Sequence, residues 1–392
     1  MISVIEASKL ISRHLPHWGE ESRALGSSLA PTCENIDSDR AYPPFHRVMM
    51  DGIAVSFDVY QIGKREFKLS GIAAAGEPQK TLTEKESCLE VMTGAPLPFG
   101  TDLVIPYEHL MLEEGKAKVR VEQERARLEH VHLEGSDCKG GDVVLKSGHI
   151  LNGPHVGIAA SMGKAFITTR KNPKILLVST GDELVEIDQR PEAHQIRRSN
   201  VFALKASLEL NGFTDITLAH LSDNALAIAK HFEESVEIFD MMIYSGGVSQ
   251  GKFDYLPNVW TDLGVKKIFH TIAQRPGKPL WFGVHEAQQT AIIGLPGNPV
   301  SSLVCLHRYF LPRRPLYATL SEEIIFKKDL TYFVPVKIES AIDGRLWAHP
   351  FKMKNSGEFT ALAGSDGFIE LPAEKSVFAS GSAYAFYPWR TF

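Results

Sequence analysis

Apolar and polar positions alternate between two periods along the middle of the chain. Short apolar runs predict buried strands, and segments with apolar residues every three or four positions predict helices. From residue 173 onward the strands Ile175 to Ser179, Asp215 to Ala219 and Met241 to Tyr244 alternate with the helices Asn200 to Leu210, Ala225 to Ser235 and Val300 to Phe310. This alternation predicts a doubly wound, mostly parallel α/β sheet.

The flanking regions follow different patterns. A first helix is expected over Val4 to Leu15, followed by an irregular stretch. From about Tyr42 to Asp137, short strands separated by Gly, Pro and charged turns predict a separate β-rich module. A helix around Val156 to Ala160 and a strand over Lys164 to Thr169 precede the α/β segment, and Thr331 to Ile338 opens a small C-terminal β domain.

Composition narrows the class of protein. With 44% hydrophobic and 23% charged residues, the 392-residue chain is typical of globular proteins, and about 150 residues per domain implies two to four domains. The net charge of −5 argues against broad nucleic-acid binding. No apolar run approaches the ~20 residues that span a bilayer, and the four cysteines are scattered without metal-ligand spacing. We therefore expect a cytoplasmic protein with reduced thiols.

Three Gly- and Pro-rich turns between residues 245 and 302 each follow an apolar run. They are Ser245 to Asp254, Arg275 to Pro279 and Gly294 to Ser302. Open α/β sheets bind ligands at the carboxyl ends of their strands, and glycine amides there can form an anion nest. Ser249, Arg275 and Lys278, with Arg197 and Arg198, add a hydroxyl and local positive charge. An oxyanion or phosphate site is the functional interpretation, and ordinary chain turns are the alternative.

Acidic residues also lie at predicted strand ends. Asp182 and Glu183 follow one strand, Asp223 follows the next, and Asp254 closes the Gly246-Gly247 loop. Because Mg²⁺ prefers oxygen ligands from carboxylates and phosphates, these four residues are candidate metal ligands. The alternative for Asp182 and Asp223 is that each caps a helix, a position that Asp favours.

Several motifs together resemble one family, the molybdopterin molybdenumtransferases of the bacterial MoeA type and the C-terminal part of gephyrin. The matching segments cover nearly the whole chain and are Met50 to Val55, Thr93 to Pro98, Ser179 to Leu184, Gly247 to Ser249 with Asp254, Pro276 to Pro279 with Phe282-Gly283, and Gly294 to Ser301. The resemblance implies a molybdopterin-binding α/β domain over 172–318 and a C-terminal β-barrel domain over 319–392. It also implies a β-rich module over 42–137 and a discontinuous N-terminal linking domain of 1–41 with 138–171.

The resemblance implies a transferase of molybdenum cofactor biosynthesis that inserts molybdenum from molybdate into adenylated molybdopterin and releases AMP, with Mg²⁺ as cofactor. It implies a homodimer in which each cleft combines the sheet domain of one chain with the C-terminal domain of the other. A molybdopterin adenylyltransferase is a further candidate partner, and no nucleic acid or membrane is expected. The alternatives are an adenylyltransferase-like enzyme, which lacks the extra β-rich modules, and a noncatalytic scaffold that retains the fold.

The resemblance also assigns roles to residues of this chain. The implied catalytic residues are Asp51, Thr93, Asp182, Glu183 and Asp254. The implied substrate-binding residues are Gly246, Gly247, Ser249, Arg275, Lys278, Asn298 and Ser301, and the implied metal ligands are Asp182, Glu183, Asp223 and Asp254. Within these sets, Arg275, Lys278 and Ser301 are expected to bind molybdate, and the Gly246-Gly247 loop with Ser249 the phosphate or pterin.

The chain departs from the family pattern at four places. Arg275 stands where many members have Lys, and Asp137 lies in Gly-Ser-Asp rather than Gly-Glu-Asp. The first strand of the C-terminal domain lacks the Arg that members often carry, which leaves Lys337 or Arg345 as substitutes. Ser356 fits the expected C-terminal serine only loosely.

Overall fold

The structure is a computed structural model that describes residues 1–392 apart from 27–29, 250–253, 312–314, 352–354, 356 and 391–392. It contains two compact units, one of Met1–Glu21 with Arg170–Phe392 and the other of Ser22–Thr169. None of the described helices combines the length and the apolar character needed to cross a membrane. The four-part domain division is finer than these two units and stays a prediction.

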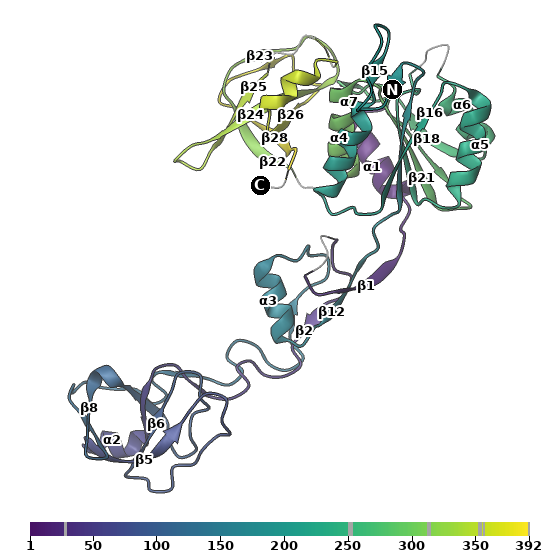
Figure 1. The fold of residues 1–392 in the computed structure, drawn as a ribbon. Coiled ribbons are helices and arrows are strands. Elements are labelled where there is room, and N and C mark those ends of the chain that lie inside the picture. The colour runs from purple at the N-terminus through teal and green to yellow at the C-terminus, as the bar shows by residue number, and fades with distance from the viewer. Residues whose placement is uncertain (27–29, 250–253, 312–314, 352–354, 356, 391–392) are drawn as a thin grey trace. The chain divides into compact units, whose positions relative to one another are not determined.

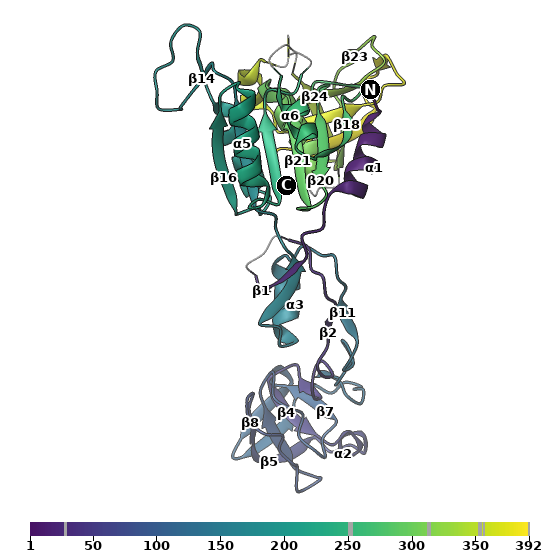
Figure 2. The same ribbon diagram turned by 90° about the vertical axis from the view of Figure 1, so that its right-hand side faces the viewer.

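A six-stranded sheet forms the centre of the larger unit. In spatial order its strands are β16 (Ile216–Leu221), β13 (Ile175–Thr180), β17 (Met241–Ser245), β21 (Thr290–Leu295), β20 (Trp281–His285) and β18 (Lys266–His270). The first four are parallel, and β20 and β18 each run antiparallel to their neighbour. Figure 2 follows the sheet from the β16 edge to the β18 edge. The predicted doubly wound, mostly parallel sheet is confirmed.

Helices cover both faces of this sheet because each strand carries apolar residues on both sides. On one face lie α1 (Val4–His14), α4 (Ser199–Glu209) and α7 (Pro299–Cys305), and on the other α5 (Ala225–Val236) and α6 (Leu256–Asp262) (Figure 1). All six residues of β13 are buried between the two layers. Because helices cover both faces of the sheet, consecutive residues of its central strands are buried, and the strand sequences are nearly continuous apolar runs.

Helix α1 packs on the sheet of the larger unit. Val4, Ala7 and Ile11 recur every three or four residues and join a core with Ile175 and Leu177 of β13. The helix begins where the Ser3 hydroxyl accepts a hydrogen bond from the backbone N–H of Glu6 at 3.1 Å. Its apolar face therefore packs against strands far along the chain.

The last helix of the α/β segment is shorter than expected. A single helix was predicted over Val300 to Phe310, whereas α7 ends at Cys305 and continues as a π-helical stretch, η2 (Leu306–Phe310). In this wider stretch Arg308 bonds to Glu370 and Tyr309 to Gln274. These tertiary contacts accompany the widened turn, and the local sequence did not indicate them.

The C-terminal part of the same unit is a closed β-barrel, as expected. Its five strands are β24 (Thr331–Ser340), β25 (Leu346–Pro350), β22 (Leu316–Leu320), β28 (Ala383–Pro388) and β26 (Gly367–Leu371), and pairing of β24 with β26 closes the ring. Between β22 and β28 the chain also forms a paired β23 (Ile324–Ile325) and β27 (Val377–Phe378), with a 3₁₀ turn, η3 (Phe359–Gly364). The short strand β19 (Gln274–Arg275) leaves the α/β domain and pairs with β24.

The second unit contains the predicted β-rich module. Its sheet has the order β7 (Leu103–Pro106), β4 (Gly52–Val55), β6 (Cys88–Val91), β5 (Glu66–Ala73), β9 (Lys116–Val119) and β8 (Leu110–Glu113), with α2 (Phe57–Gln61) and η1 (Tyr107–His109) alongside. The short pairs are β3 (Arg47–Val48) with β10 (Val131–His132) and β2 (Ile36–Asp37) with β11 (Val143–Leu145). Helix α3 (Gly153–Ser161) packs near β11, and β1 (Glu20–Ala24) pairs with β12 (Phe166–Arg170) at the boundary of the units.

Candidate active site

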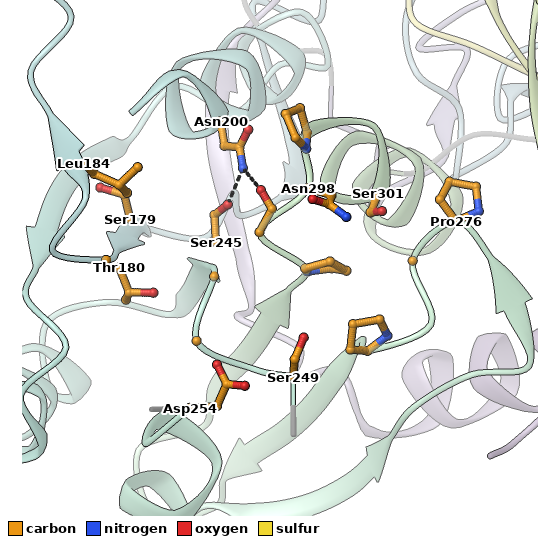
Figure 3. A pocket seen from close by; sticks show the side chains of 18 of the residues that line it. Ser179, Thr180, Leu184, Asn200, Ser245, Ser249, Asp254, Pro276, Asn298 and Ser301 are labelled. Carbon is orange, nitrogen blue, oxygen red and sulfur yellow. Dashed lines mark hydrogen bonds between the residues drawn. The ribbon is translucent and has the colours of Figure 1, made fainter. Parts of the chain in front are cut away.

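A cleft of about 740 Å³ opens at the carboxyl ends of the central parallel strands. The register aligns Ser179 of β13 with Ser245 of β17, and Ser245 with Leu295 of β21, so the loops that follow start side by side. The turn after β19 and Leu330 of the barrel complete the walls. All three turns singled out from the sequence meet here, as Figure 3 shows for labelled residues of each.

Most predicted residues of the larger unit line this cleft. They are Glu183, Asp223, Gly246, Gly247, Ser249, Asp254, Arg275, Lys278, Asn298 and Ser301. Asp182 is not in the lining, but its Oδ1 accepts a hydrogen bond from the backbone N–H of Asp223 at 3.2 Å. The fold therefore gathers the predicted acidic, glycine-rich and basic groups at one place, while their individual roles stay predictions.

Glycine is required at both positions of the Gly246-Gly247 turn. Gly246 has φ +101° and Gly247 has φ +68°, conformations that residues with a Cβ seldom adopt. A Cβ on Gly246 would lie 2.9 Å from Thr180 Oγ1, and one on Gly247 would lie 2.9 Å from Leu256 Cδ1. The turn therefore packs its backbone directly against β13, with its amides close to the cleft.

Thr180 is a lining residue that the sequence motif contained but did not single out. It is 5% exposed, and its buried hydroxyl has no hydrogen-bond partner within the part of the chain that is described. An unsatisfied buried hydroxyl is costly, and a bound ligand or water would relieve that cost. Thr180 is therefore a candidate ligand contact beside the glycine turn.

Asn200 is a second lining residue that the sequence analysis missed. Its Nδ2 donates hydrogen bonds to Ser245 Oγ at 3.0 Å and to the carbonyl oxygen of Gly297 at 2.6 Å (Figure 3). The partners lie 45 and 97 residues away in the sequence, so no local pattern could indicate this contact. Asn200 fixes the first and third turns relative to each other.

The acidic residues act on one another electrostatically. Burial, followed by repulsion from Asp182, Glu183 and Asp254, raises the pKa of Asp223 above its ordinary value. The helix-cap alternative is wrong for both aspartates. Asn224 caps α5, with its Oδ1 accepting from the N–H groups of Leu226 and Ala227, and β14 (Leu184–Val185) rather than a helix follows Asp182.

The chemistry of this donor set fits a divalent cation. Carboxylate oxygens are hard ligands, and the pKa of Asp223 is raised by burial and, beyond that, by repulsion from neighbouring carboxylates that a cation would neutralise. Within the described ranges, however, no three His, Cys, Asp or Glu side chains already stand in a metal-binding arrangement. A cation held here would take its remaining ligands from water and from substrate phosphates.

The basic side of the cleft is the turn that follows β19. Arg275 is half-buried and Lys278 is exposed, with Pro276 and Gly277 buried between them. The loop is closed by a hydrogen bond from the backbone N–H of Ile272 to the carbonyl oxygen of Lys278 at 2.9 Å. Arg197 and Arg198 line the same cleft from β15 (Ile196–Arg197) and the residue after it. The cleft therefore contains carboxylates together with several fixed cations.

Asp51 and Thr93 belong to the second unit. Asp51 Oδ1 accepts hydrogen bonds from the Thr93 hydroxyl at 2.7 Å and from its backbone N–H at 2.6 Å, and these bonds lower the pKa of Asp51. Asp137 accepts from His132 Nε2 at 2.8 Å in the same unit. The two predicted catalytic residues thus form one hydrogen-bonded pair, and their part in catalysis stays a prediction.

The proposed replacements for the C-terminal arginine do not line the cleft. Lys337 lies on β24 without lining the pocket, and Arg345 pairs with its neighbour Asp343 at 3.2 Å on an exposed turn. Leu330 is the barrel residue that lines the cleft among those described. Ser356 lies outside the described residues.

Comparison with known families covers almost the whole chain. Residues 2–163 match the MoeA N-terminal region (domain I and II), residues 176–315 the probable molybdopterin binding domain, and residues 317–389 the MoeA C-terminal region (domain IV). The fold and cleft therefore define a three-region enzyme of the MoeA class. Similarity to individual proteins makes the assignment specific.

A molybdopterin molybdenumtransferase from Synechocystis sp. is 49% identical over 390 residues, covering 99% of this chain and 100% of that protein. One from Haemophilus influenzae is 31% identical, covering 91% of this chain and 90% of that protein. The crystal structure of a molybdopterin biosynthesis MoeA protein from Pyrococcus horikosii superposes with a TM-score of 0.82 at 25% identity and 100% coverage of both chains. The chain belongs to the molybdopterin molybdenumtransferase family and is a transferase of molybdenum cofactor biosynthesis.

Proposed function

We propose that this protein binds adenylated molybdopterin and molybdate in the cleft, inserts molybdenum at the dithiolene sulfurs and releases AMP. The observation that carries this proposal is one cleft that combines a glycine turn, carboxylates and the Arg275 and Lys278 cations. A single anion needs only the cations. A phosphate-bearing substrate bound together with a divalent cation, plus a separate oxyanion, accounts for both the carboxylates and the basic side chains in one place.

The glycine turn and Ser249 are assigned to the phosphate or pterin of the adenylated substrate. Backbone amides of the turn beyond Gly246, whose own N–H donates to the Leu295 carbonyl oxygen at 3.1 Å, can donate to phosphate oxygens without the desolvation cost of long side chains. The Thr180 hydroxyl, which has no partner among the described residues, can donate as well. Arg275, Lys278, Ser301 and Asn298 are assigned to molybdate. Guanidinium and ammonium donors suit a tetrahedral oxyanion, and Arg275 supplies a planar fork where Lys would supply a point charge.

The carboxylates Asp182, Glu183, Asp223 and Asp254 would hold the divalent cation, which we assign as Mg²⁺. When bound, the cation neutralises phosphate charge in the phosphoanhydride. Oxygens of these carboxylates that are not used as cation ligands accept hydrogen bonds from the attacking water and orient it toward phosphorus. Water adds one oxygen to the pterin phosphate, AMP leaves with the bridging oxygen, and no covalent enzyme intermediate is needed.

The molybdate assignment is tested with Lys278→Ala, using AMP release and cofactor formation as readouts. Charge-assisted hydrogen bonds contribute roughly 1.5 to 3 kcal/mol, so the molybdate concentration for half-maximal rate rises about ten- to a hundredfold. Binding of the adenylated pterin stays nearly unchanged, and excess molybdate restores the rate. Lys267→Ala, an exposed lysine on β18, is the matched control. Unchanged molybdate dependence in Lys278→Ala would refute the assignment.

The proposal includes assembly as a homodimer and a cytoplasmic location. A closed twofold dimer is the commonest oligomer. Cys33, Cys88, Cys138 and Cys305, all among the described residues, form no disulfide, as expected in a reducing compartment. Sedimentation of the purified chain at several concentrations tests the assembly. A fully active monomer would contradict the shared cleft. Co-purification with a molybdopterin adenylyltransferase tests the delivery partner separately.

The two alternatives from the sequence analysis make different predictions in the same assay. An adenylyltransferase would consume ATP and form, rather than release, the adenylated pterin. A noncatalytic scaffold would bind the pterin without molybdate-dependent AMP release. The second unit and the barrel, matched over residues 2–163 and 317–389, favour the molybdenumtransferase.

A further inference from the structure

Gln274 is a buried polar residue at the start of the cationic turn. Only 1% of the residue is exposed, although it borders the cleft. Its Nε2 donates hydrogen bonds to the carbonyl oxygens of Pro276 and Gly277, both at 3.1 Å. The amide therefore bonds to the backbone between the two residues, Arg275 and Lys278, that carry the charge.

Tyr309 determines which way this amide points. Its hydroxyl donates to Gln274 Oε1, which leaves the Nε2 group facing the two carbonyl oxygens. Burial raises the pKa of Tyr309 well above its ordinary value, so the hydroxyl keeps its proton and stays a donor. Cys305 Sγ, 3.4 Å from Nε2, closes the remaining side of the pocket around the amide. Every polar atom of the Gln274 side chain is thereby occupied.

The backbone around Gln274 is held from two sides. In β19, Gln274 is aligned with Thr331 and Arg275 with Tyr332 of the barrel strand β24. Across the turn, Gly277 has φ +91°, and a Cβ there would lie 2.5 Å from Cys305 Sγ and 2.6 Å from Gln274 Nε2. A side chain at Gly277 would displace the amide. The turn is therefore built around Gln274.

We propose that Gln274, oriented by Tyr309, is a positioning residue that holds the Arg275 and Lys278 cations in the geometry that binds the oxyanion substrate. This inference rests on the proposed function, because it takes these cations as the molybdate site. Charged side chains on a loose loop must be ordered when the ligand binds, and fixing the loop beforehand removes that entropic cost. Gln274 therefore acts on molybdate affinity and leaves the pterin contacts of the glycine turn unaffected.

The first test is Gln274→Met, which keeps the volume and removes both donors, with Tyr309→Phe as a second variant. We expect the molybdate concentration for half-maximal rate to rise about tenfold in Gln274→Met, which loses two donated hydrogen bonds, and about threefold in Tyr309→Phe, which loses one, because each neutral hydrogen bond contributes about 0.7 kcal/mol. The rate at saturating molybdate and the affinity for adenylated molybdopterin stay within about twofold of wild type. Gln288→Met, at an exposed position, changes neither quantity.

The second test is the pH dependence of Gln274→Glu. The introduced carboxylate faces two carbonyl oxygens, and burial raises its pKa, so lowering the pH from about 8.5 to about 6.5 restores a proton that can be donated. The ratio of molybdate requirement, variant over wild type, falls over this range, and the corresponding ratio for Gln274→Met does not. The pH dependence of Gln274→Glu tests the positioning role of Gln274 even if Gln274→Met fails to fold.

The inference and the proposed function can fail separately. Wild-type molybdate dependence in folded Gln274→Met, or a pH-independent ratio in Gln274→Glu, overturns the positioning role. Wild-type dependence in Lys278→Ala instead overturns the molybdate assignment itself. If Lys278→Ala weakens molybdate use and Gln274→Met does not, the proposed function stands and the inference falls.

Discussion

The Asn200 side-chain amide joins Ser245, at the end of β17, to the turn that carries Gly297 on the way to α7. It donates at 3.0 Å to Ser245 Oγ and at 2.6 Å to the Gly297 carbonyl oxygen. The bridge ties two walls of the cleft to the N-terminal end of α4. Fixed walls favour anion binding, because the hydrogen-bond donors of the cleft are then already in position before the anion arrives.

We predict that Asn200→Ala lowers the rate of AMP release about tenfold and Ser245→Ala about threefold. Asn200→Ala loses both hydrogen bonds of the bridge, whereas Ser245→Ala leaves the bond to Gly297 in place, and each bond contributes about 0.7 kcal/mol. Steady-state kinetics with both single variants and the double variant measure the coupling between them. A larger loss in Ser245→Ala than in Asn200→Ala would contradict the bridging role.

We predict that Asp254→Asn and Glu183→Gln each lose about a hundredfold in AMP release with an unchanged melting temperature. Each substitution removes a charge aimed at the cation and phosphates and keeps the side-chain size. Asp188→Asn, in the same loop region as Glu183 but exposed and outside the cleft lining, serves as the matched control. Near-normal turnover in both cleft variants would remove these carboxylates from the site.

The raised pKa of Asp223 predicts a pH-dependent gain in stability for Asp223→Asn. A carboxyl group whose pKa is higher in the folded state destabilises the fold once it ionises, so wild-type stability falls as the pH rises from the ordinary aspartate value through the folded one. At about pH 7 the variant should melt above wild type, and the difference should vanish near pH 4. A difference in melting temperature between Asp223→Asn and wild type that grows toward low pH would contradict this account.

Added Mg²⁺ should raise the melting temperature of wild type more than that of Asp254→Asn.

The ion pair between Arg308 and Glu370 connects the α/β domain to the barrel. Arg308 Nε lies 2.6 Å from Glu370 Oε2, the two side chains are 14% and 18% exposed, and Arg308 Nη1 also donates to Ser8 Oγ in α1 at 3.1 Å. Removing one partner leaves a largely buried charge without its counter-ion, so we predict that Glu370→Ala lowers the free energy of unfolding by about 3 kcal/mol.

Glu286→Ala is the control for this prediction. Its ion pair with Lys266 is well exposed, with side chains 64% and 59% exposed, so its loss should destabilise the fold far less than the loss of the Arg308–Glu370 pair. Replacing both partners, as Arg308→Met with Glu370→Leu, should recover part of the lost stability because no charge is left buried. Thermal melting of all four proteins checks the order. Equal losses in Glu370→Ala and Glu286→Ala would show that burial does not matter here.

The sequence alone was sufficient for strands β13, β16 and β17, for helices α4 and α5, and for the three turns. Strands such as Ile175–Thr180 are continuous apolar runs because both of their faces are buried, and Gly and Pro interrupt the pattern at their carboxyl ends. The parallel arrangement then brings those ends together, so the predicted acidic, glycine and basic residues of the larger unit share one cleft.

Other features depended on tertiary contacts. Asn200 meets a carbonyl 97 residues away, Tyr309 orients Gln274 across 35 residues, and α1 packs on strands of the α/β domain. The π-helical stretch η2, in place of a continued α-helix, likewise accompanies the long-range contacts of Arg308 and Tyr309. Local propensity and periodicity report what a segment can form and which face it buries. Which distant side chain satisfies a buried amide or carboxylate is decided only when the folded chain brings the two together, because that hydrogen bond has no counterpart in the local sequence.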